Sequence, residues 1–227
     1  VQSISSTWAS ESASTISAAG STTSLTLSPK KLISIVQMSA EAMAQNAGLE
    51  AAIRSNMAAS IASSLEAALL GTSDVGNAPA SIFADPATTN TGVTVGDFVG
   101  LETTVLGNDV PLDGARMAYI FDKDAYVTIK SLAQVSNVSP LWDNADKRLN
   151  GYYGFFSTNV GNGGVSGKAH CLFGDFSRVH IAQFGGLDML WDPYTNAASG
   201  LGRLVATTLV DGNAVDNTTA FANIIEA

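Results

Sequence analysis

Charged side chains are scarce in this chain of 227 residues: Asp, Glu, Lys and Arg together make up 14% of it, against about 25% in an average soluble protein. Its polarity comes mainly from Ser, Thr, Asn and Gly, which can be buried at an interface for far less free energy than an ion. A monomer of this size needs more charge to remain soluble and separate. The deficit therefore favours a protein that covers much of its surface with neighbouring subunits.

Basic residues are the scarcer of the two charge types, with 11 Lys and Arg against 20 Asp and Glu and a net charge of −9. They form no run, and the nearest approaches to a cluster are Lys30-Lys31 and Lys147-Arg148. A protein that binds nucleic acid through its phosphates needs a basic stripe. The charge pattern therefore argues against that class of function.

Cys171 is the only cysteine, which excludes an internal disulfide and gives no reason to expect an oxidising compartment. No apolar run approaches the ~20 residues of a membrane-spanning helix. The Ser/Thr-rich start lacks the basic region of a signal peptide, and Val1 stands where an initiator Met would be expected. We therefore expect no membrane contact, and a longer precursor from which this chain derives.

The chain has two histidines, His170 and His180, which fall in separate predicted strands. Cys171 follows His170, but adjacent residues of a strand point to opposite faces, so these two cannot meet as base and nucleophile. A metal site would need further ligands at short spacing, and none lies nearby. The sequence therefore predicts no catalytic, cofactor-binding or metal-binding residues, no cofactor and no enzymatic activity.

One glycine cluster, Gly161-Asn162-Gly163-Gly164, invites comparison with a phosphate-binding loop. It lacks both the GxGxxG spacing and the following helix that such a loop requires. We interpret it as the flexible tip of a hairpin.

The first 38 residues are predicted to be extended, with the earlier part projecting from the main body. Ser24–Ser28 alternates polar and apolar residues as a half-buried strand does, and 32–38 alternates less strictly. A long helix then begins at Ser39, a credible N-cap, and runs to Leu70. The glycine that follows Leu70 is expected to stop it.

This predicted helix would be roughly 45 Å long at about 1.5 Å per residue. A compact globule of the same chain length has a radius of gyration of only about 17 Å, so we expect an elongated or flat subunit. Apolar residues recur at every fourth position of the helix, at Leu49, Ile53, Met57, Ile61, Leu65 and Leu69. Such a stripe drifts around the helix by about 40° per step, which predicts a helix crowded along most of its length and not a cofactor site.

The rest of the chain indicates an α+β fold with many short strands. Residues 71–95 are predicted to be loops, followed by helices at Asp97–Leu106 and, capped by Asp122, at Lys123–Ala133. Strands are predicted at Met117–Phe121, Tyr152–Ser157, His170–Phe173, Val179–Phe184, Leu187–Trp191, Leu204–Leu209 and Ala220–Ile224. We expect the last two strands to be joined by a turn at Asp211-Gly212.

The order of several short blocks resembles the major capsid proteins of tailed bacteriophages, the family of the HK97 fold. The blocks are Trp8-Ala9-Ser10-Glu11, Leu27-Ser28-Pro29-Lys30-Lys31-Leu32, Met38-Ser39-Ala40-Glu41, Leu69-Leu70-Gly71, Leu149-Asn150-Gly151-Tyr152, Phe173-Gly174-Asp175-Phe176-Ser177 and Val210-Asp211-Gly212 before Thr219-Ala220-Phe221. Each block is weak alone, but their combined order covers nearly the whole chain.

This resemblance implies a flat, L-shaped subunit with an HK97-like division into parts. Residues 1–28 would be the returning part of an extended loop that lies over a neighbouring subunit. Residues 29–90 and 196–227 would form the peripheral domain with its long spine helix, and 91–195 the axial domain around the five-fold and six-fold centres. The amino-terminal arm and the outgoing strand of the loop would precede Val1.

One position departs from family members whose shells are welded covalently. Those members carry a lysine in the extended loop just after a glutamate, whereas here Ser12 follows Glu11. We therefore expect a shell without this cross-link, held by non-covalent burial and helped by a decoration protein.

The function implied by the resemblance is that of a major capsid protein of the virion, assembled in the host bacterial cytoplasm. Copies of the chain would form the pentamers and hexamers of an icosahedral head that encloses the DNA genome. Portal, scaffolding and decoration proteins are further candidate partners, and DNA would be contacted only non-specifically because the net negative charge repels it. The residues leave open an encapsulin-type nanocompartment shell, a monomeric surface adhesion module and an uncharacterised hydrolase.

Overall fold

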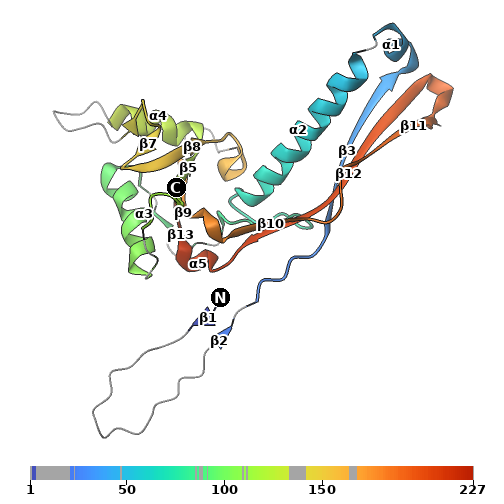
Figure 1. The fold of residues 1–227 in the computed structure, drawn as a ribbon. Coiled ribbons are helices and arrows are strands. Elements are labelled where there is room, and N and C mark those ends of the chain that lie inside the picture. Colours follow the sequence, from blue (N-terminus) through green and yellow to red (C-terminus); the bar gives the residue numbers. More distant parts are fainter. Residues whose placement is uncertain are drawn as a thin grey trace, which may run out of the picture.

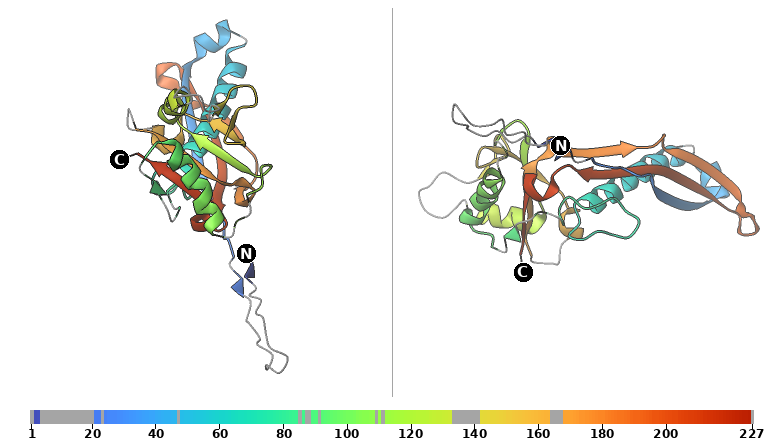
Figure 2. Two further views of the ribbon diagram at one scale, coloured as in Figure 1. Left: turned by 90° about the vertical axis from the view of Figure 1, so that its left-hand side faces the viewer. Right: turned by 90° about the horizontal axis from the view of Figure 1, so that it is seen from below.

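The computed structural model of the chain describes residues 2–3, 21–22, 24–46, 48–84, 86, 89–90, 92–108, 110, 112–132, 142–163 and 168–226. They form two parts that follow one another along a long axis (Figure 1), which is clearest when the molecule is seen from below (Figure 2). We call the described residues of 30–69 and 179–214 the long arm, and those of 89–175 and 221–225 the compact lobe. The elongated shape expected from the sequence is confirmed.

The sheet of the long arm has four antiparallel strands: β3 (Lys30–Ser39), β10 (Val179–Gln183), β11 (Asp188–Asn196) and β12 (Leu201–Ala214). The central strand is β12, which pairs with β3 along one edge and with β11 and then β10 along the other. The helix α2 (Leu49–Leu69) lies along one face of this sheet (Figure 1). The alternation of residues 32–38 is thus confirmed as a strand.

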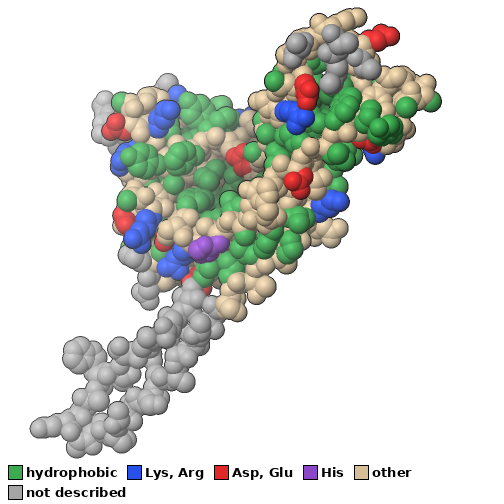
Figure 3. Space-filling model, turned by 45° about the vertical axis from the view of Figure 1, so that its right-hand side comes forward, with side chains coloured by type: hydrophobic (Ala, Val, Ile, Leu, Met, Phe, Trp, Pro, Cys, Tyr) green, Lys and Arg blue, Asp and Glu red, His purple; other side chains and the backbone are tan. Residues whose placement is uncertain are grey.

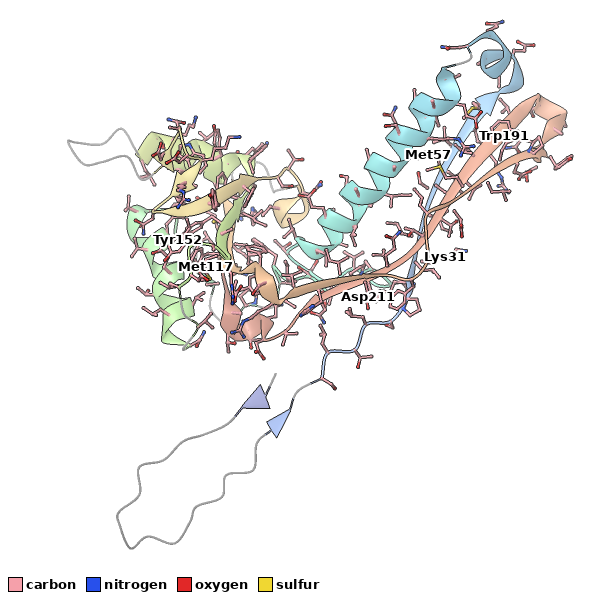
Figure 4. The ribbon with its side chains drawn as sticks, in the orientation of Figure 1. Lys31, Met57, Met117, Tyr152, Trp191 and Asp211 are labelled. Atoms are coloured by element: carbon pink, nitrogen blue, oxygen red, sulfur yellow. The ribbon has the colours of Figure 1, made fainter. Side chains whose placement is uncertain are left out.

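Side chains from α2 and from the inner face of the sheet form a small core. Met57, Leu204 and Ala206 are buried there, and Trp191 packs beside them. Figure 4 shows Met57 on α2 and Trp191 on β11 inside the arm. Gly202 leaves room for the indole, because a Cβ at that position would lie 2.2 Å from the Trp191 ring.

The predicted long helix is interrupted and forms two helices, α1 (Ala40–Gln45) and α2. Its N-cap is confirmed, since the Ser39 hydroxyl accepts a hydrogen bond from the N–H of Ala42 at 3.2 Å. The chain leaves helical geometry at Asn46, whose side-chain oxygen instead accepts from the N–H of Gly48 at 3.1 Å. Asn and Gly are weak helix formers, so the prediction of one helix was wrong at this point.

No helix among the described residues is long and apolar enough to cross a membrane.

The compact lobe is built on a seven-stranded mixed sheet in the order β4-β13-β9-β5-β8-β7-β6. Its strands are β4 (Thr89–Asn90), β5 (Met117–Phe121), β6 (Trp142–Asp143), β7 (Arg148–Leu149), β8 (Tyr152–Phe156), β9 (His170–Asp175) and β13 (Phe221–Ile225). Two pairings, β4 with β13 and β5 with β8, are parallel. The interior strand β9 is buried along its whole length.

Both faces of this sheet are covered. On one face lie α3 (Val95–Gly107) and α4 (Lys123–Leu132), which close a core that contains Phe98, Ile129 and Phe173. The other face packs against the root of the arm through a second core that includes Leu70, Phe83 and Phe221. The lobe and the arm are therefore joined by buried apolar contacts.

The strands do not divide at the domain boundaries that the sequence analysis placed. Strands β10 and β11, expected within 91–195, pair with β12 in the arm. Strand β13, expected with the peripheral segment 196–227, pairs with β9 and β4 in the lobe. Both differences arise because sheet partners are chosen by register across distant segments, which local sequence patterns do not encode.

The predicted turn at Asp211-Gly212 is also wrong, because both residues lie inside β12. Asp211 is buried, and its carboxylate accepts hydrogen bonds from the N–H of Ser28 at 2.8 Å and of Gly212 at 2.9 Å. The chain bends instead at Asp216, whose φ is 56°, just before α5 (Asn217–Ala220). An Asp-Gly pair usually favours a turn. Here the strand continues through it, because the buried Asp211 carboxylate is satisfied by hydrogen-bond donors around it.

The amino-terminal segment is only partly described. Ser24–Ser28 alternates in exposure as expected, but it forms no strand ladder, so the prediction of a strand there was wrong. Strands β1 (Gln2–Ser3) and β2 (Ser21–Thr22) pair in antiparallel fashion. Ser12 and the rest of 4–20 lie outside the described residues.

Among the glycines of the lobe, Gly174 should be the one at which an added side chain destabilises the fold most. A Cβ there would lie 2.5 Å from the carbonyl oxygen of Ala220 and 2.3 Å from the Phe221 ring. We expect Gly174→Ala to lower the free energy of unfolding by about 1–3 kcal/mol, measured by urea denaturation of dissociated subunits. Gly107→Ala is the control, since no atom lies within 4 Å of its added Cβ. Equal midpoints for the two variants would contradict the packing described here.

Candidate assembly surfaces

The histidine and aspartate that lie closest together are buried in the lobe. His170 Nδ1 lies 3.2 Å from Asp122 Oδ2, and both side chains are 5% exposed. Asp122 Oδ1 also accepts hydrogen bonds from the N–H of Ala125 at 2.8 Å and of His170 at 3.2 Å. The carboxylate therefore caps α4, as predicted from the sequence, and ties this helix to β9.

Cys171 points to the opposite side of β9 from His170. Its thiol lies in the core with Phe121 and Phe173, and burial raises its pKa well above the ordinary value. A thiol in this state is a poor nucleophile. Among the described residues, no group of three or more His, Cys, Asp or Glu side chains could hold a metal ion.

The glycine cluster is packed and does not form a free hairpin tip in its described part. Gly161 lies in the short 3-10 helix η1 (Val160–Gly163) with a φ of +69°. A Cβ at Gly161 would lie 2.7 Å from the His170 ring. The glycine is therefore needed for its backbone conformation and for close packing, and Gly164 lies outside the described residues.

Sequence reasoning missed a buried polar network around Glu102. Tyr119 Oη donates a hydrogen bond to Glu102 Oε1 at 2.6 Å, and Asn150 Nδ2 donates to both carboxylate oxygens at 2.8 and 3.0 Å. Burial, reinforced by the bond to Glu102, raises the pKa of Tyr119 far above its ordinary value. The sequence signal that could have revealed this network is Glu102 itself, a charged residue on the apolar face of the predicted helix Asp97–Leu106. The network joins α3, β5 and the β7–β8 turn and is architectural.

A second anchor fixes where the amino-terminal segment leaves the arm. Lys30 Nζ lies 3.3 Å from Asp211 Oδ1 and donates a hydrogen bond to the carbonyl of Ala78 at 2.8 Å. Asp211, which is labelled in Figure 4, also accepts a hydrogen bond from the N–H of Ser28, at the elbow where the amino-terminal segment joins the arm. The direction in which the chain before Ser28 projects is therefore set by a buried carboxylate.

The outer face of the arm sheet, turned away from α2, is apolar and open. Its central row is Ile35, Val205 and Leu190, which are aligned across three strands. Ile35 is 54% exposed, Leu190 66% and the neighbouring Ile33 45%. No described element packs over this face (Figure 1). An exposed apolar surface on a structured sheet typically marks an interaction site.

The compact lobe carries two further apolar surfaces. The first is a hollow of about 720 Å³ between α4 and β6–β8 that we call the aromatic hollow; it is lined by Phe121, Lys123, Tyr126, Val127, Trp142, Asn144, Asp146, Lys147, Tyr153, Gly154, Phe155 and Phe156. The second, the α3 stripe, consists of the exposed side chains Val95, Val99 and Leu106 on one helix. Figure 3 shows hydrophobic side chains at the surface of both parts of the molecule, with charged ones scattered between them.

The sequence predicted that the long helix is crowded along most of its length. Within one copy, α2 is not crowded in this way. Of its six regularly spaced apolar residues, Met57 and Leu69 are buried and the others are half-buried. Small residues such as Ala51, Ala59 and Ala62 are exposed on its remaining faces. Open apolar surfaces of this kind on α2, the arm sheet and the lobe are typical of a structural subunit that associates with others.

The sequence pattern of the Phage capsid family matches residues 2–223. The chain belongs to this family, and its role is that of a structural shell protein. The predicted resemblance to phage major capsid proteins is confirmed. No curated protein sequence is significantly similar to the chain.

Solved structures that match the fold of this chain come from capsids and from phages. The capsid of an empty GTA particle, computed with C5 symmetry, has a TM-score of 0.71 and 20% identity, covering 98% of this chain and 81% of that one. The structure from Gordonia phage Cozz also has a TM-score of 0.71, with 14% identity and coverage of 100% and 80%. The procapsid of satellite phage P4, which includes the size determination protein, has a TM-score of 0.64 and 10% identity, with coverage of 99% and 79%. These similarities confirm the predicted α+β, HK97-like fold.

Tyr119 should remain un-ionised until the protein unfolds. Because its folded pKa is raised above an unfolded value of about 10, the resulting stability is complete below about pH 10 and is lost as the pH rises toward the folded value. We expect Tyr119→Phe to leave the reversible tyrosinate absorbance titration unchanged. Loss of a reversible tyrosine ionisation in the Tyr119 variant would contradict the buried network.

Proposed function

We propose that this protein is the major capsid protein of a phage head, and that copies of it form the pentamers and hexamers of an icosahedral shell around the DNA genome. The observation that carries the proposal is the family match over residues 2–223, on a fold whose open surfaces are apolar. In this proposal the compact lobe serves as the axial domain and the long arm as the peripheral domain. Residues 1–28 serve as the returning part of the extended loop.

The amount of exposed surface supports association. The chain has 12960 Å² of accessible surface, whereas a compact monomer of 23.3 kDa would have about 9,700 Å². Specific subunit interfaces bury about 1,600 Å² in total. The accessible surface of the chain exceeds that of a compact monomer by about a third, which is enough area for contacts with more than one neighbour. This surface also carries few charges.

The related particles support the same assembly mode. A GTA capsid of this fold was computed with C5 symmetry, and a procapsid of this fold includes a size determination protein. By analogy, portal, scaffolding and decoration proteins are candidate partners, and assembly takes place in the host bacterial cytoplasm. The net charge of −9 keeps the contact with packaged DNA non-specific through repulsion. The comparisons give no support to the nanocompartment and adhesion alternatives.

Two further features of the proposal rest on the sequence. The shell is held without a covalent cross-link at the position of Ser12, which follows Glu11 and lies outside the described residues. The protein has no enzymatic activity of its own and uses no cofactor. Its stability in the particle then comes from burial of surfaces such as the outer face of the arm sheet.

The proposal is tested by the particle size of the full-length protein, with light scattering and negative-stain microscopy on one sample. We expect rings of five or six subunits, or closed shells. A stable monomer at high concentration would overturn the proposal and return the adhesion module to consideration.

Ile35→Glu tests the outer face of the arm sheet in the same assay. The side chain is 54% exposed, so the isolated subunit should keep its stability, but burying an unpaired carboxylate against a neighbour is costly. We expect the protein concentration needed for assembly to rise about tenfold or more. Gln37→Glu, on the same strand and face and opposite Arg203, is the control and should assemble normally. Unchanged assembly of the Ile35 variant would show that this face stays open in the particle.

A further inference from the structure

The aromatic hollow and the α3 stripe lie at opposite edges of the lobe sheet. The hollow is formed over β6, β7 and β8, which end the sheet on one side. The helix α3 packs on β13, β9 and β4, which end it on the other. The two surfaces thus lie over different strands of one sheet, with β5 between β9 and β8.

The two surfaces also differ in shape. The hollow is concave, and its volume of about 720 Å³ falls within the range of sites that enclose a binding partner's groups. The aromatic side chains Tyr153, Phe155 and Phe156 are each about half exposed at its wall. The α3 stripe is convex, with Val95, Val99 and Leu106 projecting from one helix, which is the shape that enters an apolar groove.

Their charges are complementary as well. The hollow is lined by Lys123 and Lys147 against one carboxylate, Asp146. Two more cations, Lys130 and Arg148, lie over the rings of lining tyrosines, at 4.8 and 4.3 Å from the ring centroids. The helix α3 contains no Lys or Arg, and its partly exposed charged residue, Asp97, is acidic, whereas Glu102 is buried in the network with Tyr119 and Asn150. Opposite charge at the two surfaces favours their contact over contact between like surfaces.

We propose that the aromatic hollow of one copy receives the α3 stripe of a second copy, in a head-to-tail contact between compact lobes. This inference rests on the proposed function and adds the surfaces that join neighbours within one ring. A two-fold contact through the hollow alone would set two concave and basic surfaces together, and a reciprocal two-fold contact between hollow and stripe would stop at a dimer. A head-to-tail contact between unlike surfaces repeats from copy to copy, and it closes into a ring when the rotation between copies divides a full turn.

Cysteine cross-linking tests this contact directly. The single native cysteine, Cys171, is fully buried, so a bis-maleimide will react only with introduced thiols. We expect the full-length double variant Val99→Cys/Phe155→Cys to give a ladder of cross-linked oligomers in denaturing electrophoresis. Each single variant should stay monomeric, and a mixture of the two should stop at dimers. The control pair Val75→Cys/Phe155→Cys, with an exposed residue of the loop after α2, should give no ladder.

A charge substitution tests the electrostatic part independently of cysteine chemistry. We expect Val99→Lys, which brings a cation to Lys123 and Lys147, to raise the concentration needed for ring or shell formation about tenfold. Val99→Asp, with the opposite charge at the same site, should raise it much less. Equal effects of the two variants would overturn the charge complementarity on which the orientation depends.

The outcomes separate this inference from the proposed function. Shells that form without a ladder from the double variant would overturn the head-to-tail contact and leave the capsid function standing. Cross-linked dimers from Phe155→Cys alone would overturn it in favour of a two-fold contact through the hollow. A wild-type protein that stays monomeric would overturn the capsid function, and with it this contact.

Discussion

Burial of the inner face of β12 beneath α2 is the constraint on which the rest of the structure depends. This strand of 14 residues pairs with β3, β10 and β11 and supplies Leu204 and Ala206 to the arm core. It then leads through α5 into β13 of the lobe sheet. One continuous segment thus runs through both parts, which are joined by the buried core that includes Leu70, Phe83 and Phe221.

Buried carboxylates connect the secondary-structure elements of both parts through hydrogen bonds. Glu102 is satisfied by Tyr119 and Asn150, and Asp122 by His170 and two backbone N–H groups. Asp211 is satisfied by Lys30 and the backbone at the elbow of the arm. A buried ion is tolerated only when it is paired or hydrogen-bonded. In a chain with few charges, these acidic groups therefore serve the architecture and leave broad outer surfaces apolar.

Local patterns predicted the elements well and their partners poorly. The Ser39 cap, the strand Met117–Phe121 and the Asp122 cap of α4 follow from signals within a few residues, and the structure confirms all three. The break at Asn46 was not predicted, because the apolar repeat continues past it. Asp211-Gly212 was predicted to be a turn, because neither the burial of Asp211 nor its hydrogen bond from the distant Ser28 can be recognised in the sequence. The hollow was not predicted, since it is built from segments that meet only in the folded lobe. The α3 stripe was not predicted either, because the face of the helix that stays exposed is decided by its packing on the sheet.

The sequence by itself determined the family of this protein, because the order of its capsid-like blocks is a property of the sequence alone. The tertiary structure decided which surfaces stay open. Strand alternation turns Ile35 and Leu190 outward only because β12 aligns their strands with α2 on the other face. Register and packing between distant segments determine what stays exposed, and no local pattern contains that information.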